Sequence, residues 1–216
     1  MEVMTSRVVF IQGGGAGAYD GDALLADSLR EHLGDGYVVD YPRLPDEDEP
    51  DDRLWLGEIG AVTSRAAAAV PADSDADGAD DDKNVNDAVV LVGHSAGGYM
   101  LLKFLGRELG APGLNEFKLI AAKISALCII AAPFPGGDPD WTFDDFELPD
   151  DLGALLPATM AVFLYASPDD EIVPFAHRDL LAAAMPQATV RATSGGHQLN
   201  NDLRVVADDI RTTIET

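Results

Sequence analysis

The chain lacks several features that define large classes of proteins. Its 216 residues include a single cysteine, Cys128, which excludes an internal disulfide framework and a cysteine-based metal cluster and which we interpret as a small core residue. No run of about 18 apolar residues occurs, and the N-terminus leads directly into a strand-like segment. We therefore expect neither a spanning helix nor a cleavable signal peptide, and we expect a cytoplasmic protein.

Basic residues are also scarce. There are 14 of them against 38 acidic residues, which gives a net charge of −24. Such a surface repels phosphate backbones, anionic lipids and anionic substrates, so we expect no nucleic-acid partner and no membrane partner. Two explanations of the acidity stay open: adaptation to concentrated salt, where screening removes the self-repulsion, or a high-GC genome with an acidic insertion.

Apolar runs alternate with helical patterns along the chain. This alternation predicts βαβ units and an α/β fold: one domain over residues 1–216, a three-layer α/β/α sandwich around a mostly parallel sheet of about six strands. The expected strands are Arg7–Gln12, Tyr37–Tyr41, Ala88–Gly93, Ile124–Ala131, Ala161–Ala166 and Ala188–Thr193. The expected helices are Gly21–Leu33, Arg53–Val70, Ala96–Leu109, Phe175–Met185 and Leu199–Glu215.

Two segments depart from this alternation. Residues 71–87 hold seven aspartates, and an Asp-x-Asp-x-Asp-Gly stretch among them resembles the opening of an EF-hand calcium loop. Because Asn84 stands where that loop needs a bidentate glutamate, we interpret the segment as a solvated acidic loop, and we expect no metal site. The second segment, 133–157, carries Trp141 and Phe143, which either seal an edge of the core or form a small roof over a site.

The sequence Gly93-His94-Ser95-Ala96-Gly97 fits G-x-S-x-G, the nucleophile elbow. The glycines are needed because the serine occupies a strained strand-to-helix turn, where flanking side chains would collide. An apolar strand precedes the motif and a good helix follows it. Ser95 is therefore the candidate nucleophile, and the alternative is an ordinary glycine-rich turn with a capping serine.

A serine hydroxyl needs a base to take its proton, and the chain has four histidines: His32, His94, His177 and His197. His197 follows the last expected strand. It should therefore lie at the same edge of the sheet as the elbow, because the carboxyl ends of parallel strands meet there. We predict His197 as the base; a merely structural loop histidine is the alternative.

Three acids follow the penultimate expected strand: Asp169, Asp170 and Glu171. A catalytic carboxylate must orient the imidazole and stabilise its charged form. The D-x-x-V-P spacing selects Asp170, while its two neighbours are expected to be solvated.

An oxyanion hole needs two backbone donors aimed at the developing charge. One is expected from the amide of Ala96. The other is expected from the glycine run that follows the first strand, through Gly14 or else Gly15, because such a run lets the backbone approach a ligand closely. The run is also close to a dinucleotide loop, but its spacing differs from G-x-G-x-x-G.

With these motifs in order, the chain resembles small, essentially cap-less α/β-hydrolase-fold serine hydrolases, in particular the YdeN-like hydrolases, from residue 7 to about 203. The Ser…Asp…His order is that of this fold, and the segment 41–45 is similar to the family's proline-rich loop. The resemblance implies a central parallel sheet, Ser–Asp–His catalysis and no cofactor. It also has departures: Gln12 replaces the usual histidine before the oxyanion glycines, and the insertion at 71–87 has no family counterpart.

The expected function is cleavage of carboxylic esters, or of related acyl bonds such as thioesters, in a small-molecule acyl substrate. Two alternatives stay open: a binding or scaffolding protein that kept the fold, and a non-hydrolytic use of the triad as a lyase or perhydrolase. Candidate substrate-binding residues, some of which could equally be plain core, are His94, Tyr99, Met100, Trp141 and Phe143.

Overall fold

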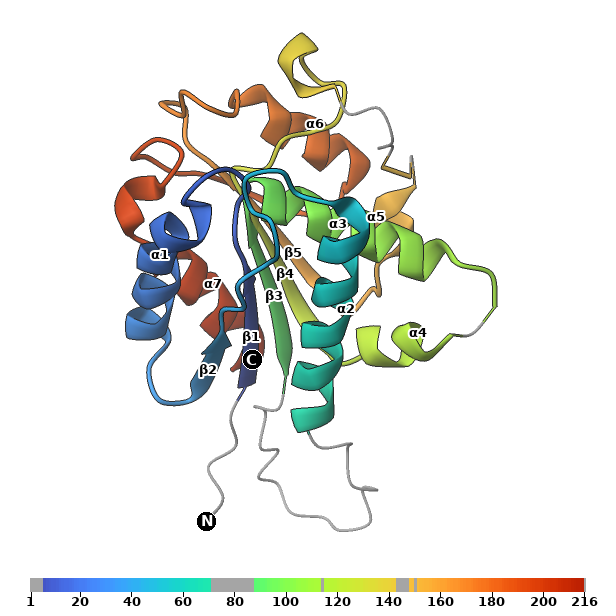
Figure 1. Cartoon of the computed structure of the whole chain (residues 1–216). Coiled ribbons are helices and arrows are strands. Elements are labelled where there is room, and N and C mark those ends of the chain that lie inside the picture. The colour runs from blue at the N-terminus through green and yellow to red at the C-terminus, as the bar shows by residue number, and fades with distance from the viewer. Residues whose placement is uncertain (1–5, 71–87, 114, 143–147, 150, 216) are drawn as a thin grey trace, which may run out of the picture.

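The computed structural model describes residues 6–70, 88–113, 115–142, 148–149 and 151–215. In this part of the chain six parallel strands form one sheet in the order β2-β1-β3-β4-β5-β6, which confirms the predicted fold class (Figure 1). The strands are β1 (Ser6–Ile11), β2 (Tyr37–Asp40), β3 (Val89–His94), β4 (Ile124–Ile130), β5 (Ala161–Ala166) and β6 (Thr189–Ala192).

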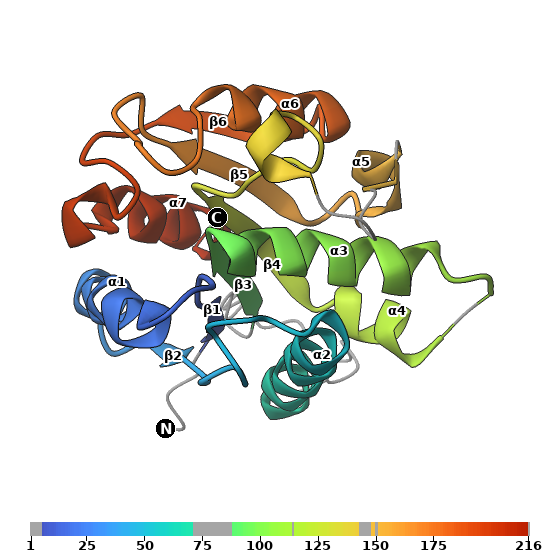
Figure 2. The ribbon, with the colours of Figure 1, turned by 45° about the horizontal axis from the view of Figure 1, so that its top comes forward.

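Helices cover both faces of the sheet and complete the three layers. Figure 2 shows α1 and α7 on one side and α2 and α3 on the other, and α4, α5 and α6 contribute to the core on the side of α2 and α3. The helices are α1 (Ala18–Leu33), α2 (Asp52–Ala69), α3 (Ala96–Gly110), α4 (Glu116–Ala121), α5 (Leu152–Leu155), α6 (Ala176–Ala184) and α7 (Arg204–Ile214).

The strand sequences explain the two-sided packing. Successive side chains of a strand point to opposite faces. In β1, Val8 and Phe10 therefore join the core under α1 and α7, whereas Val9 and Ile11 join the core under α2 and α3. All four are fully buried, which is why the strand is a continuous apolar run and not an alternating one.

The strand order contains a reversal between β1 and β3. The chain leaves β1 toward the edge strand β2 through α1, and it leaves β3 in the opposite direction through α3. The loops that follow β1 and β3 therefore diverge to opposite faces and leave a crevice at the carboxyl end of the sheet. Such a switch point is where open α/β sheets bind ligands.

The elements differ from the predictions mainly at their ends. The last helix begins at Arg204 rather than Leu199, because residues 199–201 have positive φ angles and form a short 3-10 turn. A right-handed helix cannot run through such residues. The short helices α4 and α5 were not predicted. Residues 71–87 lie outside the described part of the chain.

Within the described residues, no helix is both long enough and apolar enough to cross a membrane.

Candidate active site

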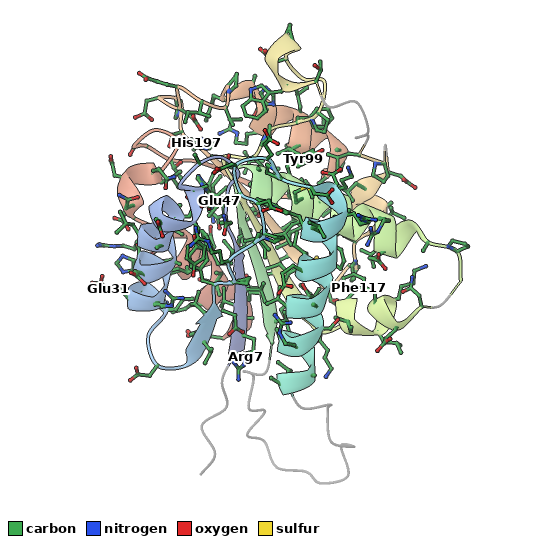
Figure 3. The ribbon with its side chains drawn as sticks, viewed as in Figure 1. Arg7, Glu31, Glu47, Tyr99, Phe117 and His197 are labelled. Atoms are coloured by element: carbon green, nitrogen blue, oxygen red, sulfur yellow. The ribbon has the colours of Figure 1, made fainter. Side chains whose placement is uncertain are left out.

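A cavity of about 470 Å³ lies at the switch point. Ile11 of β1 pairs with Gly93 of β3, so the residues that follow these strands emerge side by side. The cavity is lined by the glycine loop (residues 13–17), by the start of α3 and by the loops that follow β4, β5 and β6. In Figure 3, His197 lies at this edge of the sheet and Arg7 at the opposite edge.

Ser95 occupies a sharp turn between β3 and α3. Its backbone has φ 52° and ψ −125°, a strained conformation for a residue with a side chain. A Cβ added to Gly97 would lie 2.1 Å from the carbonyl oxygen of Gln12, and one added to Gly93 would lie 2.6 Å from the Cα of Gly98. The two flanking positions therefore accept only glycine, as the elbow motif requires.

His197 and Asp170 form a hydrogen-bonded pair. Nδ1 of His197 lies 2.9 Å from Oδ2 of Asp170, whose side chain is 1% exposed. The other oxygen of Asp170 accepts the amides of Ile172 and Val173 at 2.8 and 3.0 Å. Burial acts to raise the pKa of Asp170, but the bond from His197 and the two amides outweigh it and hold the pKa below its ordinary value. An ionised carboxylate only accepts, so Nδ1 of His197 carries a proton and donates the hydrogen bond.

Ser95 and His197 line the same cavity, but their side chains are not hydrogen-bonded to each other. Across the ranges that the structure describes, Ser95 Oγ has no hydrogen-bond partner. In a free enzyme the bond between nucleophile and base is often long, and it tightens when substrate binds. The structure thus gathers the three residues predicted to act together at one site, with the bond between acid and base formed.

Two backbone amides at the cavity can donate hydrogen bonds to a bound group. In the described part of the chain the amides of Gly14 and Ala96 have no protein acceptor, and a Cβ on Gly14 would lie 3.3 Å from the Cβ of Ala96. The amide of Gly15 instead donates to the carbonyl oxygen of Glu47 at 2.5 Å. The geometry therefore favours Gly14 over Gly15 as the partner of Ala96, because the amide of Gly15 is already engaged.

The glycine loop is held in place by the segment after β2. Glu47 accepts the amide of Tyr19 at 2.7 Å and the side-chain amide of Gln12 at 2.9 Å. The Tyr19 amide is the main reason why the pKa of Glu47 lies below its ordinary value. The same segment is anchored by the fully buried Trp55, whose indole N–H donates to the carbonyl of Pro45. Gln12 thus ties the glycine loop to this segment.

His94 belongs to a buried polar network. Its Nδ1 lies 2.9 Å from Oδ2 of Asp22, and its Nε2 lies 3.0 Å from the carbonyl oxygen of His197. Asp22 also accepts the amide of Gly13 at 2.7 Å and the side-chain amide of Gln198 at 2.9 Å. Both ring nitrogens of His94 are used within the protein, so the ring offers no polar atom to a substrate.

Asp22 was not predicted as a site residue, although its position in the sequence is unusual for a carboxylate. Asp22 stands in the apolar stripe of α1, at the start of the series Leu25, Ala26, Leu29 and Leu33, all of which are buried. A carboxylate at a core position of a helix needs a buried partner. Its partner, His94, is 72 positions away and could be named only from the fold.

The side walls of the cavity include three apolar residues. Trp141, in a short 3-10 turn (Pro139–Trp141), lines it as predicted. Ile172 and Pro50 also line it, and neither was predicted. Ile172 is 57% exposed, although it is a large apolar side chain. These residues give the cavity an apolar rim.

Other predicted wall residues lie elsewhere. Tyr99 and Met100 belong to the hydrophobic core and do not line the cavity, so their prediction as wall residues is wrong. The reason is that the first turns of α3 are buried on all sides by the sheet and by neighbouring helices. Phe143 lies outside the described residues.

Cys128 does not line the cavity. Cys128 is fully buried in β4, and burial raises its pKa to about 12. In the described ranges, no group of three or more histidine, cysteine, aspartate or glutamate side chains could hold a metal ion.

The family of the chain follows from comparison with known sequences. A family model described as the alpha/beta hydrolase family matches residues 8–213. The chain therefore belongs to the alpha/beta hydrolase family, and this membership supports hydrolase activity. No curated protein sequence matches the chain significantly.

Solved structures share the fold over nearly the whole chain. The ydeN gene product of Bacillus subtilis has a TM-score of 0.60 at 18% identity, covering 99% of this chain and 100% of that chain. A structure from a study of the metagenome-derived lipolytic enzymes LipS and LipT has a TM-score of 0.65 at 15% identity, covering 99% and 95%. Est1E from Butyrivibrio proteoclasticus has a TM-score of 0.62 at 15% identity, covering 100% and 90%. At these identities the likeness shows the fold alone.

Proposed function

We propose that this chain is a serine hydrolase that cleaves carboxylic esters, or related acyl bonds such as thioesters, of small substrates. One observation carries the proposal: His197 is hydrogen-bonded to the buried Asp170 and shares a cavity with Ser95 in a nucleophile elbow. The family, and one structural neighbour from a study of lipolytic enzymes and of lipase and esterase families, support the same reaction class.

In the proposed first step, Ser95 Oγ attacks the acyl carbon while Nε2 of His197 takes its proton. Asp170 keeps the imidazole in the tautomer with the proton on Nδ1, and it stabilises the imidazolium that forms. The attack produces a tetrahedral intermediate with a negatively charged oxygen. The amides of Gly14 and Ala96 donate to that oxygen.

Collapse of the intermediate breaks the bond to the leaving group, which takes the proton from His197. Ser95 is then acylated. Water attacks the acyl-enzyme with His197 again acting as base, and the acid product and free Ser95 are released. Every proton moves through Nε2 of one imidazole, so the mechanism depends on the placement of that ring.

The cavity supports a small and uncharged or weakly charged acyl substrate. Its volume of about 470 Å³ lies within the usual range for small-molecule sites. The side chains of Trp141, Ile172 and Pro50 offer it an apolar wall. The net charge of −24 disfavours anionic substrates by long-range repulsion.

The proposal is tested by kinetics on a panel of p-nitrophenyl esters and acyl thioesters of increasing chain length. Wild type should hydrolyse at least one short-chain member, and Ser95→Ala should lose about 10⁶-fold in kcat. Ser64→Ala, on the exposed face of α2, is the matched control and should leave kcat unchanged. Folding of each variant is checked by circular dichroism. A folded wild type that is inactive on the whole panel, or an active Ser95→Ala, would contradict the proposal and favour the binding or non-hydrolytic alternatives.

A further inference from the structure

A second imidazole–carboxylate pair lies directly beside the nucleophile, and the mechanism above does not use it. The side chain of His94 is 2% exposed and that of Asp22 is 1% exposed. Burying two ionisable groups is costly unless each is paired and fully hydrogen-bonded. The contacts of this pair therefore indicate what it does.

The pair joins three segments that are far apart in the sequence. Asp22 of α1 accepts from the glycine loop through Gly13 and from the loop after β6 through Gln198. His94, at the end of β3, then reaches the carbonyl oxygen of His197 at 3.0 Å. The nucleophile, one oxyanion loop and the base are thus connected through one buried carboxylate.

The hydrogen bonds of His94 require protons on both ring nitrogens. The carbonyl oxygen of His197 can only accept, so Nε2 must donate. Asp22 accepts from two further N–H donors, as an ionised carboxylate does, so Nδ1 must donate as well. Burial acts to raise the pKa of Asp22, but the hydrogen bond and charge of His94, with the two N–H donors, hold the pKa below its ordinary value. Neither neutral tautomer of His94 can make both bonds.

The loop that carries His197 needs such an anchor. Gly195 and Gly196 before it have φ angles of 99° and 66°, and Leu199 after it has φ 47°. The two glycines give this loop more conformational freedom than the end of an ordinary strand has. The bond to Asp170 fixes one ring atom of His197, whereas the bond from His94 fixes its main chain.

We propose that the Asp22–His94 pair positions the catalytic base: a doubly protonated His94 holds the main chain of His197, so that Nε2 of His197 is aligned with Ser95. The inference rests on the proposed function for the role of His197. His94 and Asp22 are positioning residues and do not touch the reacting atoms.

The first test is kinetic. His94→Leu removes the donor to His197 and should lower kcat for the best ester by about 10²-fold with KM close to wild type, because the fault is in alignment and not in binding. His94→Gln places an amide N–H near the former Nε2 and should recover about tenfold of this loss. His32→Gln, in the last turn of α1 and paired with Asp202, is the matched control and should keep wild-type kcat. Equal kcat values for His94→Leu and wild type, or no recovery in a folded His94→Gln, would overturn the proposal.

The second test is spectroscopic and does not depend on activity. In ¹⁵N-histidine-labelled wild type at neutral pH, both ring nitrogens of His94 should carry protons, with chemical shifts of an imidazolium. Asp22→Asn removes the negative partner and should return His94 to a single ring proton. A singly protonated His94 in wild type would overturn the proton assignment.

The two kinds of failure are distinguishable. If folded wild type hydrolyses nothing in the panel, the proposed function fails, while the nuclear magnetic resonance spectra still report the pair. If wild type is active and His94→Leu retains its kcat, the proposed function stands and the positioning role falls.

Discussion

Nδ1 of His197 lies 2.9 Å from Oδ2 of Asp170, although the two residues stand on different loops 27 positions apart. The contact follows from the sheet. β5 and β6 are parallel neighbours in which Ala166 pairs with Ala192, so their following loops start together. The hydroxyls of Ser167 and Thr193, 2.9 Å apart, join the two loops at their origin.

This contact predicts a large kinetic effect for a small change at Asp170. Asp170→Asn keeps the shape of the side chain but no longer enforces the tautomer of His197 with the proton on Nδ1. We expect kcat to fall by about 10⁴-fold with little change in KM. Asp179→Asn, at an exposed carboxylate on α6, is the control. Steady-state kinetics measure this effect, and a decrease in kcat of less than about tenfold would show that Asp170 does not have the proposed role.

Gly97→Ala should disrupt the elbow. The new Cβ would lie 2.1 Å from the carbonyl oxygen of Gln12, so β1 or α3 must move. We expect a loss of about 3 kcal/mol or more in the free energy of unfolding. Gly57→Ala, in the middle of α2 with nothing within 4 Å of the added Cβ, should be neutral or stabilising by up to about 1 kcal/mol. Urea unfolding gives the free energy of unfolding of each variant, and equal values for the two variants would contradict this explanation of the turn.

His177 should make the protein less stable in mild acid. Its Nδ1 accepts the amide of Phe134 at 2.7 Å, and within the described residues its buried Nε2 has no partner. Burial lowers the pKa of His177, although Asp138 opposes this. The unfolded chain therefore binds more protons than the folded one below about pH 6.5, and stability falls as the pH drops through this range.

His177→Asn places an amide oxygen near the former Nδ1 as an acceptor for Phe134 but cannot titrate, so its free energy of unfolding should fall less than that of wild type between about pH 7 and pH 5. The other ionisable groups are the same in both proteins, so their contributions cancel in the comparison. Identical pH dependence in the two proteins would show that His177 does not contribute.

The sequence was sufficient for the four inner strands because burial on both faces makes β1, β3, β4 and β5 largely apolar runs, whereas the edge strands β2 and β6 are shorter and more exposed. It was also sufficient for the placement of Ser95, Asp170 and His197, since each follows a strand and all strand ends meet at one edge. The Asp22–His94 pair could not be predicted, because the two residues are 72 positions apart in the sequence and their contact depends on how α1 packs against the sheet. Tyr99 was wrongly predicted to line the cavity for a related reason. The spacing of apolar residues along a helix does not show how many of its faces pack against neighbouring elements.

Ile172→Ala should alter substrate preference without altering stability. Ile172 is 57% exposed yet lines the cavity, so its side chain contributes little to the core. We expect kcat/KM for longer acyl chains to fall by about tenfold, with a smaller change for acetyl esters. Leu119→Ala, at a residue of α4 that is 62% exposed and does not line the cavity, is the control. The same loss in both variants, or no change with chain length in Ile172→Ala, would contradict a role in the substrate wall.

The central claim is that Ser95 is an activated nucleophile, and intact-mass labelling with a fluorophosphonate probe tests it most directly. The measurement compares folded wild type and Ser95→Ala at low and at molar salt, since the charge of −24 makes the outcome sensitive to screening. The account predicts one adduct on wild type, located at Ser95 by peptide mapping, and none on the variant. No adduct on folded wild type at any salt concentration, or an adduct that survives Ser95→Ala, would contradict it.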